Sequence, residues 1–195
     1  MDNHGRPSSH GKLARILIDP SFRKRAIRYA LRLPTPLDTE DRRVLEQVIF
    51  RYYVSQPDIQ TILFVGVDWY TKHYERAFFR GRTLWTLDVD PKTRKFGARR
   101  HVTSALEDAQ LHFPPDHFDL IVCSGVYGFG IDTLEQCERA FGACYELLRP
   151  NGDFVLGWND IAGHRPVPMG SIESLSRFAP TRLPPLQTHC YVTDT

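Results

Sequence analysis

The sequence contains no apolar run long enough to span a bilayer, and its opening MDNHGRPSSHGK lacks the apolar stretch of a signal peptide. The formal net charge is only +2 over 195 residues, so charge alone indicates neither a nucleic-acid nor a membrane partner. These absences favour a cytoplasmic protein. The length is sufficient for one domain with a sizeable apolar core.

Cysteine is scarce, and no two cysteines form a CxxC pair. The four are Cys123, Cys137, Cys144 and Cys190. We therefore expect reduced thiols rather than a disulfide framework. Cys137 and Cys144 lie seven residues apart in a helical pattern, which predicts that both pack in the core. The histidines lack the spacing of metal ligands and no HExxH motif occurs, so we expect no metal site.

The N-terminal part begins with a polar stretch, residues 1–18, that we expect to be loosely attached. The segment DPSFRKRAIRYALRLPTP then predicts a basic amphipathic helix over residues 19–33, with Asp19 as a cap and Pro20 at its first position. Three interpretations stay open for this helix. It is a solvated surface helix, an attachment to an anionic membrane surface or acidic partner, or a lid over a substrate.

A second helix is predicted in LDTEDRRVLEQVIFRYYVSQ, where apolar residues recur at helical spacing until Pro57 and Asp58 end the pattern. The two helical segments together suggest an N-terminal extension over residues 1–56. Residues 57–195 then form the main domain.

From Thr61 onward, predicted strands alternate with predicted helices. The strands are TILFVGV, TLWTLDVD, RRHVTSA, FDLIVCSG and DFVLGWND, and the helices are YTKHYERAFF and IDTLEQCERAFGACYELLR. Asp132 and Glu135 resemble a capping box at the start of the longer helix. This alternation predicts an α/β fold with a doubly wound, mostly parallel sheet. In the proline-rich remainder, SIESLSRF reads as a helix and QTHCYVTD as a strand.

In such a sheet, ligands bind at the carboxyl ends of the strands, near the switch in strand order. The predicted residues there are Gly66–Tyr70, Asp88–Asp90, Ser104–Leu106, Ser124–Tyr127 and Trp158–Asp160. Asp88 closes the second strand about 20 residues after the glycine turn, a position from which a carboxylate accepts hydrogen bonds from ribose hydroxyls. Asp90 is equally well explained as a cap of the PKTRKF turn.

The order of these segments resembles the class I S-adenosylmethionine-dependent methyltransferases over roughly residues 60–160. The matching stretches are ILFVGVDWY, LWTLDVDP, HVTSALED, DHFDLIVCSGVYGFG and LLRPNGDFVLGW. The resemblance implies S-adenosylmethionine as cofactor. It assigns cofactor binding to Gly66, Val67, Asp68, Trp69, Tyr70, Asp88, Val89, Ser104, Ala105, Leu106, Ser124 and Gly125.

The first motif departs from that family's pattern. Phe64 stands where the family has an acid within the first strand, and Asp68 and Tyr70 stand where it has its second and third glycines. Ser104 replaces the acid that binds adenine in many members. Two outcomes stay open. Asp68 adopts left-handed φ and accepts from the cofactor's ammonium group while aromatic rings pack on the sulfonium, or the pocket is filled and closed.

The resemblance implies methyl transfer by in-line displacement, in which positioning contributes much of the rate. A hydroxyl or amine acceptor often needs a base, and the candidates are His73, Tyr127, Asp160 and His164. Asp160 and His164 lie four residues apart and could form an acid-oriented imidazole. Each of these residues is also explained as an ordinary loop or turn residue.

Three functions follow from these patterns. The first is methyl transfer to a small-molecule or sugar-like acceptor. The second is a non-catalytic methyltransferase-like scaffold that binds a partner through its basic helix, favoured by the altered glycine turn. A nicotinamide-dependent enzyme is a third class, but the sequence lacks GxGxxG and a recognisable Tyr/Lys catalytic pair.

The resemblance also implies a seven-stranded sheet, whereas QTHCYVTDT provides for only one strand after the last predicted helix. We therefore expect an incomplete C-terminal hairpin and a chain that is a shortened form of a longer relative. The open sheet edge would leave the chain marginally stable, be filled by its own N-terminal segment, or pair with a second copy in a dimer.

Overall fold

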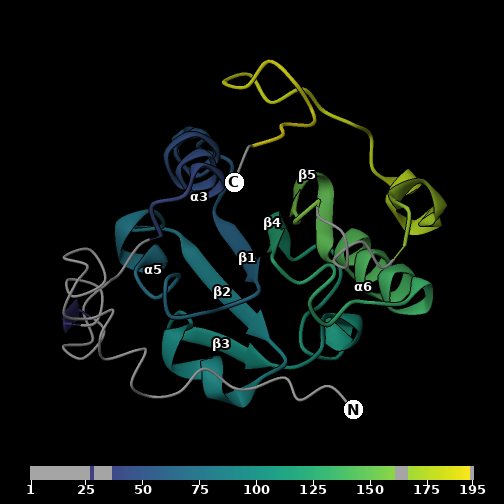
Figure 1. Cartoon of the computed structure of the whole chain (residues 1–195), viewed down its shortest axis with the longest axis horizontal. Coiled ribbons are helices and arrows are strands. Elements are labelled where there is room, and N and C mark those ends of the chain that lie inside the picture. The colour runs from purple at the N-terminus through teal and green to yellow at the C-terminus, as the bar shows by residue number, and fades with distance from the viewer. Residues whose placement is uncertain (1–26, 29–36, 161–166, 194–195) are drawn as a thin grey trace, which may run out of the picture. The chain divides into compact units, whose positions relative to one another are not determined.

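The computed structural model describes residues 27–28, 37–160 and 167–193 (Figure 1). The chain divides into two compact units, Met1–Pro36 and Leu37–Thr195. The predicted helix over residues 19–33 lies outside the described residues except for Ile27 and Arg28, which are helical and exposed. The second predicted helix belongs to the larger unit. The boundary therefore falls between Pro36 and Leu37 rather than after residue 56.

The larger unit is built on a five-stranded parallel sheet with strand order β3-β2-β1-β4-β5. The strands are β1 (Thr61–Val65), β2 (Thr83–Asp88), β3 (Arg100–Thr103), β4 (Phe118–Ser124) and β5 (Leu148–Gly157). Strand order reverses between β1 and β4, so the switch point lies at the carboxyl ends of these two strands. The predicted doubly wound α/β fold is confirmed.

Helices cover both faces of the sheet, and Figure 1 shows α6 on one side with α3 and α5 on the other. One core cluster joins the sheet to α6 (Leu134–Leu147), η3 (Leu106–Leu111) and η5 (Glu173–Arg177). It includes the buried cysteines of β4 and α6, as the spacing of Cys137 and Cys144 predicted.

The second core cluster joins the opposite face to one continuous helical segment. This segment consists of α3 (Glu40–Arg43), the π-helical η1 (Val44–Ile49) and α4 (Phe50–Ser55). Phe50 is fully buried and meets the rings of Phe64, Tyr74, Phe78 and Phe79 at centroid distances of 4.8–6.2 Å. These aromatic contacts hold the helical segment that precedes the sheet against β1 and the region of α5 (Tyr74–Ala77).

The start of α6 differs from the expected capping box. Thr133, not Asp132, is the N-cap, and its hydroxyl accepts from the amide of Gln136. The side chain of Gln136 in turn accepts from the amide of Thr133. The motif is the predicted one shifted by one residue, because Thr133 has the extended backbone that a cap requires.

Two predicted elements are wrong. The helix expected over residues 70–79 is only the four-residue α5 (Tyr74–Ala77), because Asp68 and Thr71 hold the preceding residues in a turn. The strand expected over residues 187–194 does not form within the described residues. Only an isolated bridge joins Leu183 to Thr188, and Gln187 has a φ of 57° that interrupts extended structure. The predicted helix in SIESLSRF is a 3₁₀ segment, η5.

Candidate functional site

The glycine turn after β1 and the acid that ends β2 meet at one edge of the sheet. The amide of Gly66 donates to the carbonyl of Leu87 at 3.1 Å, and the amide of Val67 donates to Oδ2 of Asp88 at 2.7 Å. Parallel strands end at the same edge, so this contact follows from the topology. The expectation that Gly66 and Asp88 share one side of the sheet is confirmed.

Gly66 is required by both its backbone conformation and its surroundings. Its φ is +89°, and a Cβ at this position would lie 2.4 Å from the carbonyl oxygen of Ser124. The loop after β1 therefore passes against the end of β4 with no room for a side chain. Positive φ and close backbone approach, the two purposes of glycine in the first motif, are therefore both retained at this one position.

Asp88 is half-buried and organises two loops at once. Besides Val67, its carboxylate accepts from the amide of Asp90 at 2.9 Å. A carboxylate has about four acceptor positions, so Asp88 keeps acceptor capacity for hydroxyl groups of a ligand. Asp90 instead caps η2 (Pro91–Phe96) by accepting from the amide of Lys92, which is the second of its two predicted roles.

Asp68 does not replace glycine by adopting left-handed φ. Among the described non-glycine residues, positive φ occurs only at Asp116, Asn151 and Gln187. The carboxylate of Asp68 accepts from the amide of Trp69 at 2.6 Å, and Thr71 bonds to the backbone of Asp68 in both directions. The left-handed interpretation is wrong because this side-chain network stabilises a turn of ordinary handedness.

Tyr70 meets a residue that sequence reasoning missed. Arg42 on α3 places its guanidinium 4.7 Å from the centre of the Tyr70 ring, and its Nη2 donates to the Tyr70 hydroxyl at 3.4 Å. A Cβ on Gly125 would lie 3.9 Å from the same Nη2. Arg42 therefore sits where the loops after β1 and β4 converge. The sequence did hold a signal for Arg42. It lies three residues before the apolar Leu45, and helical periodicity puts residues at that spacing on the same, buried face.

Burial raises the pKa of the Tyr70 hydroxyl, as do the negative charges of Asp68, Asp41 and Asp88, while Arg42 opposes the shift. The Tyr70 hydroxyl is therefore close enough to Asp68 in the turn and to Asp88 for their charges to act on it. The site is thus partly shielded from water, and its charges act on one another more strongly than exposed charges would.

A buried polar network lies behind Arg42 on the same helix. The hydroxyl of Tyr74 donates to Glu46 at 2.9 Å, and Nε2 of His73 lies 3.9 Å from the same carboxylate. Burial raises the pKa of Glu46, and the hydrogen bond from Tyr74 and the charge of Arg42 oppose that change. Glu46 lies on the π-helical η1, about one turn after Arg42 on α3.

The remaining cofactor residues named by the sequence line the same edge. Ser104 donates its amide to the carbonyl of Asp88 at 3.1 Å, and Leu106 is buried at the start of η3. The amide of Gly125 donates to Gly157, so the loop after β4 stays attached to β5. Val89 is 66% exposed and points to solvent.

The structure describes three of the four candidate bases, His73, Tyr127 and Asp160. The ring of Tyr127 is buried in the core, and its hydroxyl donates to the carbonyl of Val167. Asp160 is exposed beyond β5, and His164 lies outside the described residues. No group of three or more histidine, cysteine or acidic residues in the described part of the chain could hold a metal ion.

Residues 65–156 match a family described as a methyltransferase domain. The match covers just under half of the chain, and over these residues the chain is similar to the class I S-adenosylmethionine-dependent methyltransferase family. The matched range begins at the end of β1 and ends within β5. It therefore contains the glycine turn, Asp88 and the loop after β4. A search of curated proteins gave no match.

The chain is similar to several solved structures at low sequence identity, and the first of those named here supports the fold. A SAM-dependent methyltransferase from Archaeoglobus fulgidus is 14% identical, with a TM-score of 0.51 over 70% of this chain and 66% of that one. A methyltransferase from Mesorhizobium loti is 22% identical, with a TM-score of 0.39 over 54% and 50%. A sugar N-methyltransferase from Streptoalloteichus is 16% identical, with a TM-score of 0.44 over 80% and 56%. The chain covers just under two thirds of the Archaeoglobus protein.

The cofactor of this methyltransferase family is S-adenosylmethionine, and the edge of the sheet fits it. Asp88 offers acceptor positions for ribose hydroxyls, and Gly66 lets the loop after β1 pass close to the end of β4. The aromatic faces of Trp69 and Tyr70 are half-exposed at the same loop. A cationic sulfur is attracted to such faces.

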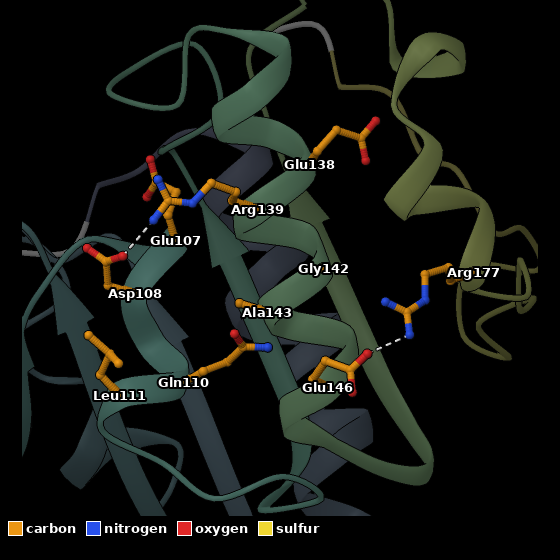
Figure 2. Close-up of a pocket in the computed structure, with 10 residues that line it drawn as sticks. All are labelled: Glu107, Asp108, Gln110, Leu111, Glu138, Arg139, Gly142, Ala143, Glu146 and Arg177. Carbon is orange, nitrogen blue, oxygen red and sulfur yellow. Dashed lines mark hydrogen bonds and ion pairs between the residues drawn. The ribbon is translucent and has the colours of Figure 1, made fainter.

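A separate groove of about 490 Å³ lies on the helical layer, between η3, α6 and η5 (Figure 2). Its charges are largely matched, because Arg139 pairs with Asp108 at 2.7 Å and Arg177 pairs with Glu146 at 2.6 Å. Glu138 accepts from the amides that begin η5. None of the residues that line the groove is among those that the sequence placed at the carboxyl ends of the strands, so we assign it no part in cofactor binding.

Proposed function

We propose that this chain transfers a methyl group from S-adenosylmethionine to a small-molecule acceptor, with sugar-like molecules as one class. The observation that carries the proposal is the contact between the glycine turn after β1 and Asp88 at the end of β2, beside the switch point. That contact supports a ribose site at the end of β2. The acceptor class itself is an inference from the family and from the aromatic side chains around the site.

The strand order supports one orientation for the cofactor. Ribose at Asp88 places adenine toward Ser104–Leu106 after β3, and it places the methionine end past Gly66 toward the loop at Ser124 and Gly125. When bound, S-adenosylmethionine supplies a methyl group on a cationic sulfur. The proposed task of Trp69 and Tyr70 is to face that cation and keep water from it.

For the proton of the acceptor, we propose Asp160 and His164 as an acid-oriented base. Their support is their position beyond the end of β5 and their four-residue spacing. Tyr127 is the weaker candidate, because its hydroxyl already donates to Val167 and its ring is buried. Substituting His164 by Gln should lower turnover and leave cofactor affinity unchanged.

A calorimetric titration with S-adenosylmethionine and with its demethylated product tests the proposal directly. We expect both to bind, with thermal stabilisation of the chain that rises with the logarithm of the ligand concentration once ligand is in excess. Absence of any binding would instead support the second candidate, a non-catalytic partner-binding protein. The stacking of Arg42 on Tyr70 favours that candidate, since it narrows the loop region where the glycines would leave space.

Partners and location complete the proposal. A cytoplasmic location is supported by the four cysteines, which are all free thiols. No helix in the described part of the chain has the length and apolarity to cross a membrane. We propose that residues 19–33 contact an acidic partner or membrane surface, supported by their arginine and lysine content, and that the edge of β5 pairs with a second copy.

A further inference from the structure

Arg42 holds a buried positive charge that the steps above do not use. Its side chain is only 9% exposed, and its Nη1 is buried with no hydrogen-bond partner among the described residues. A guanidinium has five N–H donors and stays charged at any physiological pH. Burying a charged N–H donor without a hydrogen bond costs free energy, so we expect an acceptor to bind at this position.

The neighbours of Arg42 satisfy only part of the guanidinium. Nη2 reaches the Tyr70 hydroxyl at a long 3.4 Å, and Nε lies 3.6 Å from the carboxylate of Asp41. Glu46 on the next turn is held by the hydroxyl of Tyr74. Nη1 is buried without a partner among the described residues. Nη2, the other arm of the same fork, faces the loop that contains Gly125. An anion at this side would complete the fork of donors.

The helix that follows β1 is too short and too late in the chain to supply positive potential at this edge. In many nucleotide-binding sheets, the helix after the first strand points its positive N-terminal end at the ligand. Here α5 has only four residues and begins at Tyr74, eight residues after Gly66. Arg42 comes from α3, before the sheet, and supplies a full charge to the same edge.

We propose that Arg42 binds the carboxylate at the amino-acid end of S-adenosylmethionine and makes the site selective for a carboxylated cofactor. The proposal rests on the proposed function. With ribose at Asp88 on β2, the amino-acid end crosses β1 toward β4, a span of two strand spacings or about 10 Å. Arg42 lies at the β4 end of that span, beside Gly125.

The test compares two ligands that differ only in that carboxylate. S-Adenosylmethionine and decarboxylated S-adenosylmethionine are titrated by calorimetry into the parent chain and into Arg42→Gln, Arg42→Lys and Arg43→Gln. Arg43 is the matched control, because its side chain is 65% exposed and its ion pair among the described residues is with the exposed Asp38. We expect the parent and Arg43→Gln to prefer the carboxylated ligand by about tenfold or more.

In Arg42→Gln the preference should fall to near unity, and in Arg42→Lys it should be intermediate, because an ammonium keeps the charge but not the fork. Equal affinity of the parent for both ligands would overturn the inference without any variant. A preference that survives in Arg42→Gln would do the same, while the proposed function would stand. A parent that binds neither ligand would overturn the proposed function itself, and this inference with it.

Discussion

Asp88 shows how one side chain serves the scaffold and the ligand together. Two backbone amides, those of Val67 and Asp90, already bind its carboxylate and hold the loops that follow β1 and β2. The same bonds fix the direction of the remaining lone pairs, so that a ligand hydroxyl meets an oriented acceptor. Because single hydrogen bonds orient the Asp88 carboxylate, single substitutions can test its role.

Asp88→Ala should weaken S-adenosylmethionine binding by about 1–3 kcal/mol, the usual scale for hydrogen bonds to a charged group. Calorimetric titration measures the change. Asp90→Ala is the control, because Asp90 caps η2 and should affect affinity little. Unchanged affinity in Asp88→Ala would remove Asp88 from the cofactor site.

Gly66→Ala should destabilise the fold more than Gly81→Ala does. Both glycines have similar φ, +89° and +85°, but a Cβ at Gly81 meets nothing within 4 Å, whereas one at Gly66 meets the carbonyl of Ser124. The strain of positive φ costs each variant more than about 1 kcal/mol. Urea unfolding measures the loss in free energy of unfolding for each variant, and the difference between the two losses is the cost of the contact between Gly66 and β4. Equal losses would show that this contact is unimportant.

At the scale of elements, the amino ends of three strands are joined by one carboxylate. Asp119 on β4 accepts from the amides of Gln60 and Thr61, both at 2.7 Å, and from Nε of Arg149 on β5. Burial works to raise the pKa of Asp119, but the bonds from Thr61, Gln60 and Arg149 lower it below its ordinary value. The carboxylate thus fixes the register of β1, β4 and β5 at the edge opposite the site.

Since the folded pKa of Asp119 is depressed, its contribution is complete above the unfolded pKa, near about 4, and is lost as pH falls through the folded value. Asp119→Asn should therefore lower the free energy of unfolding by about 1–3 kcal/mol at pH 7. The difference from the parent should shrink below about pH 4. Urea unfolding across this pH range measures both effects.

Asp58→Asn is the control for that series, since Asp58 is 68% exposed and pairs with the same Arg149 at 3.2 Å. An exposed pair of this kind contributes little, so its removal should change stability by less than about 1 kcal/mol at any pH. A gap between the parent and Asp119→Asn that stays constant down to pH 2 would contradict the titration argument.

The sequence predicted helices and strands correctly where the hydrophobic pattern extended over many residues. It did so less well where polar side chains form hydrogen bonds with the backbone that would otherwise be part of a helix. The apolar strands and the 14-residue α6 follow from the sequence pattern. The helix expected over residues 70–79 shortened to α5, because Asp68 and Thr71 bond to their own backbone and stabilise a turn instead. Propensity alone did not reveal this competition.

At the scale of the whole molecule, β5 is the edge strand of the described sheet and pairs only with β4. The segment after η5 passes from the α6 side toward α3, as Figure 1 shows, and it packs Phe178 on one face and Leu183 on the other. It covers apolar side chains but adds no strand to β5 within the described residues. Unpaired backbone groups at such an edge favour association.

We therefore expect the chain to form a dimer through β5. Light scattering over a range of protein concentrations should show a mass near twice 22.5 kDa at the higher concentrations. Hydrogen exchange should then slow at the β5 amides as concentration rises, because pairing with a second strand protects them. A monomer at all concentrations, with unchanged exchange in β5, would contradict the prediction.

The sequence by itself determined the parallel sheet, the position of Gly66 and the place of Asp88, because strand periodicity and the end of a strand are local properties. It could not determine that Arg42 reaches Tyr70, since the two lie 28 residues apart and meet only when the helix before β1 packs on the sheet. The same holds for Tyr127, whose hydroxyl finds Val167 40 residues later. Contacts between distant segments depend on packing, and packing is decided by the tertiary structure alone.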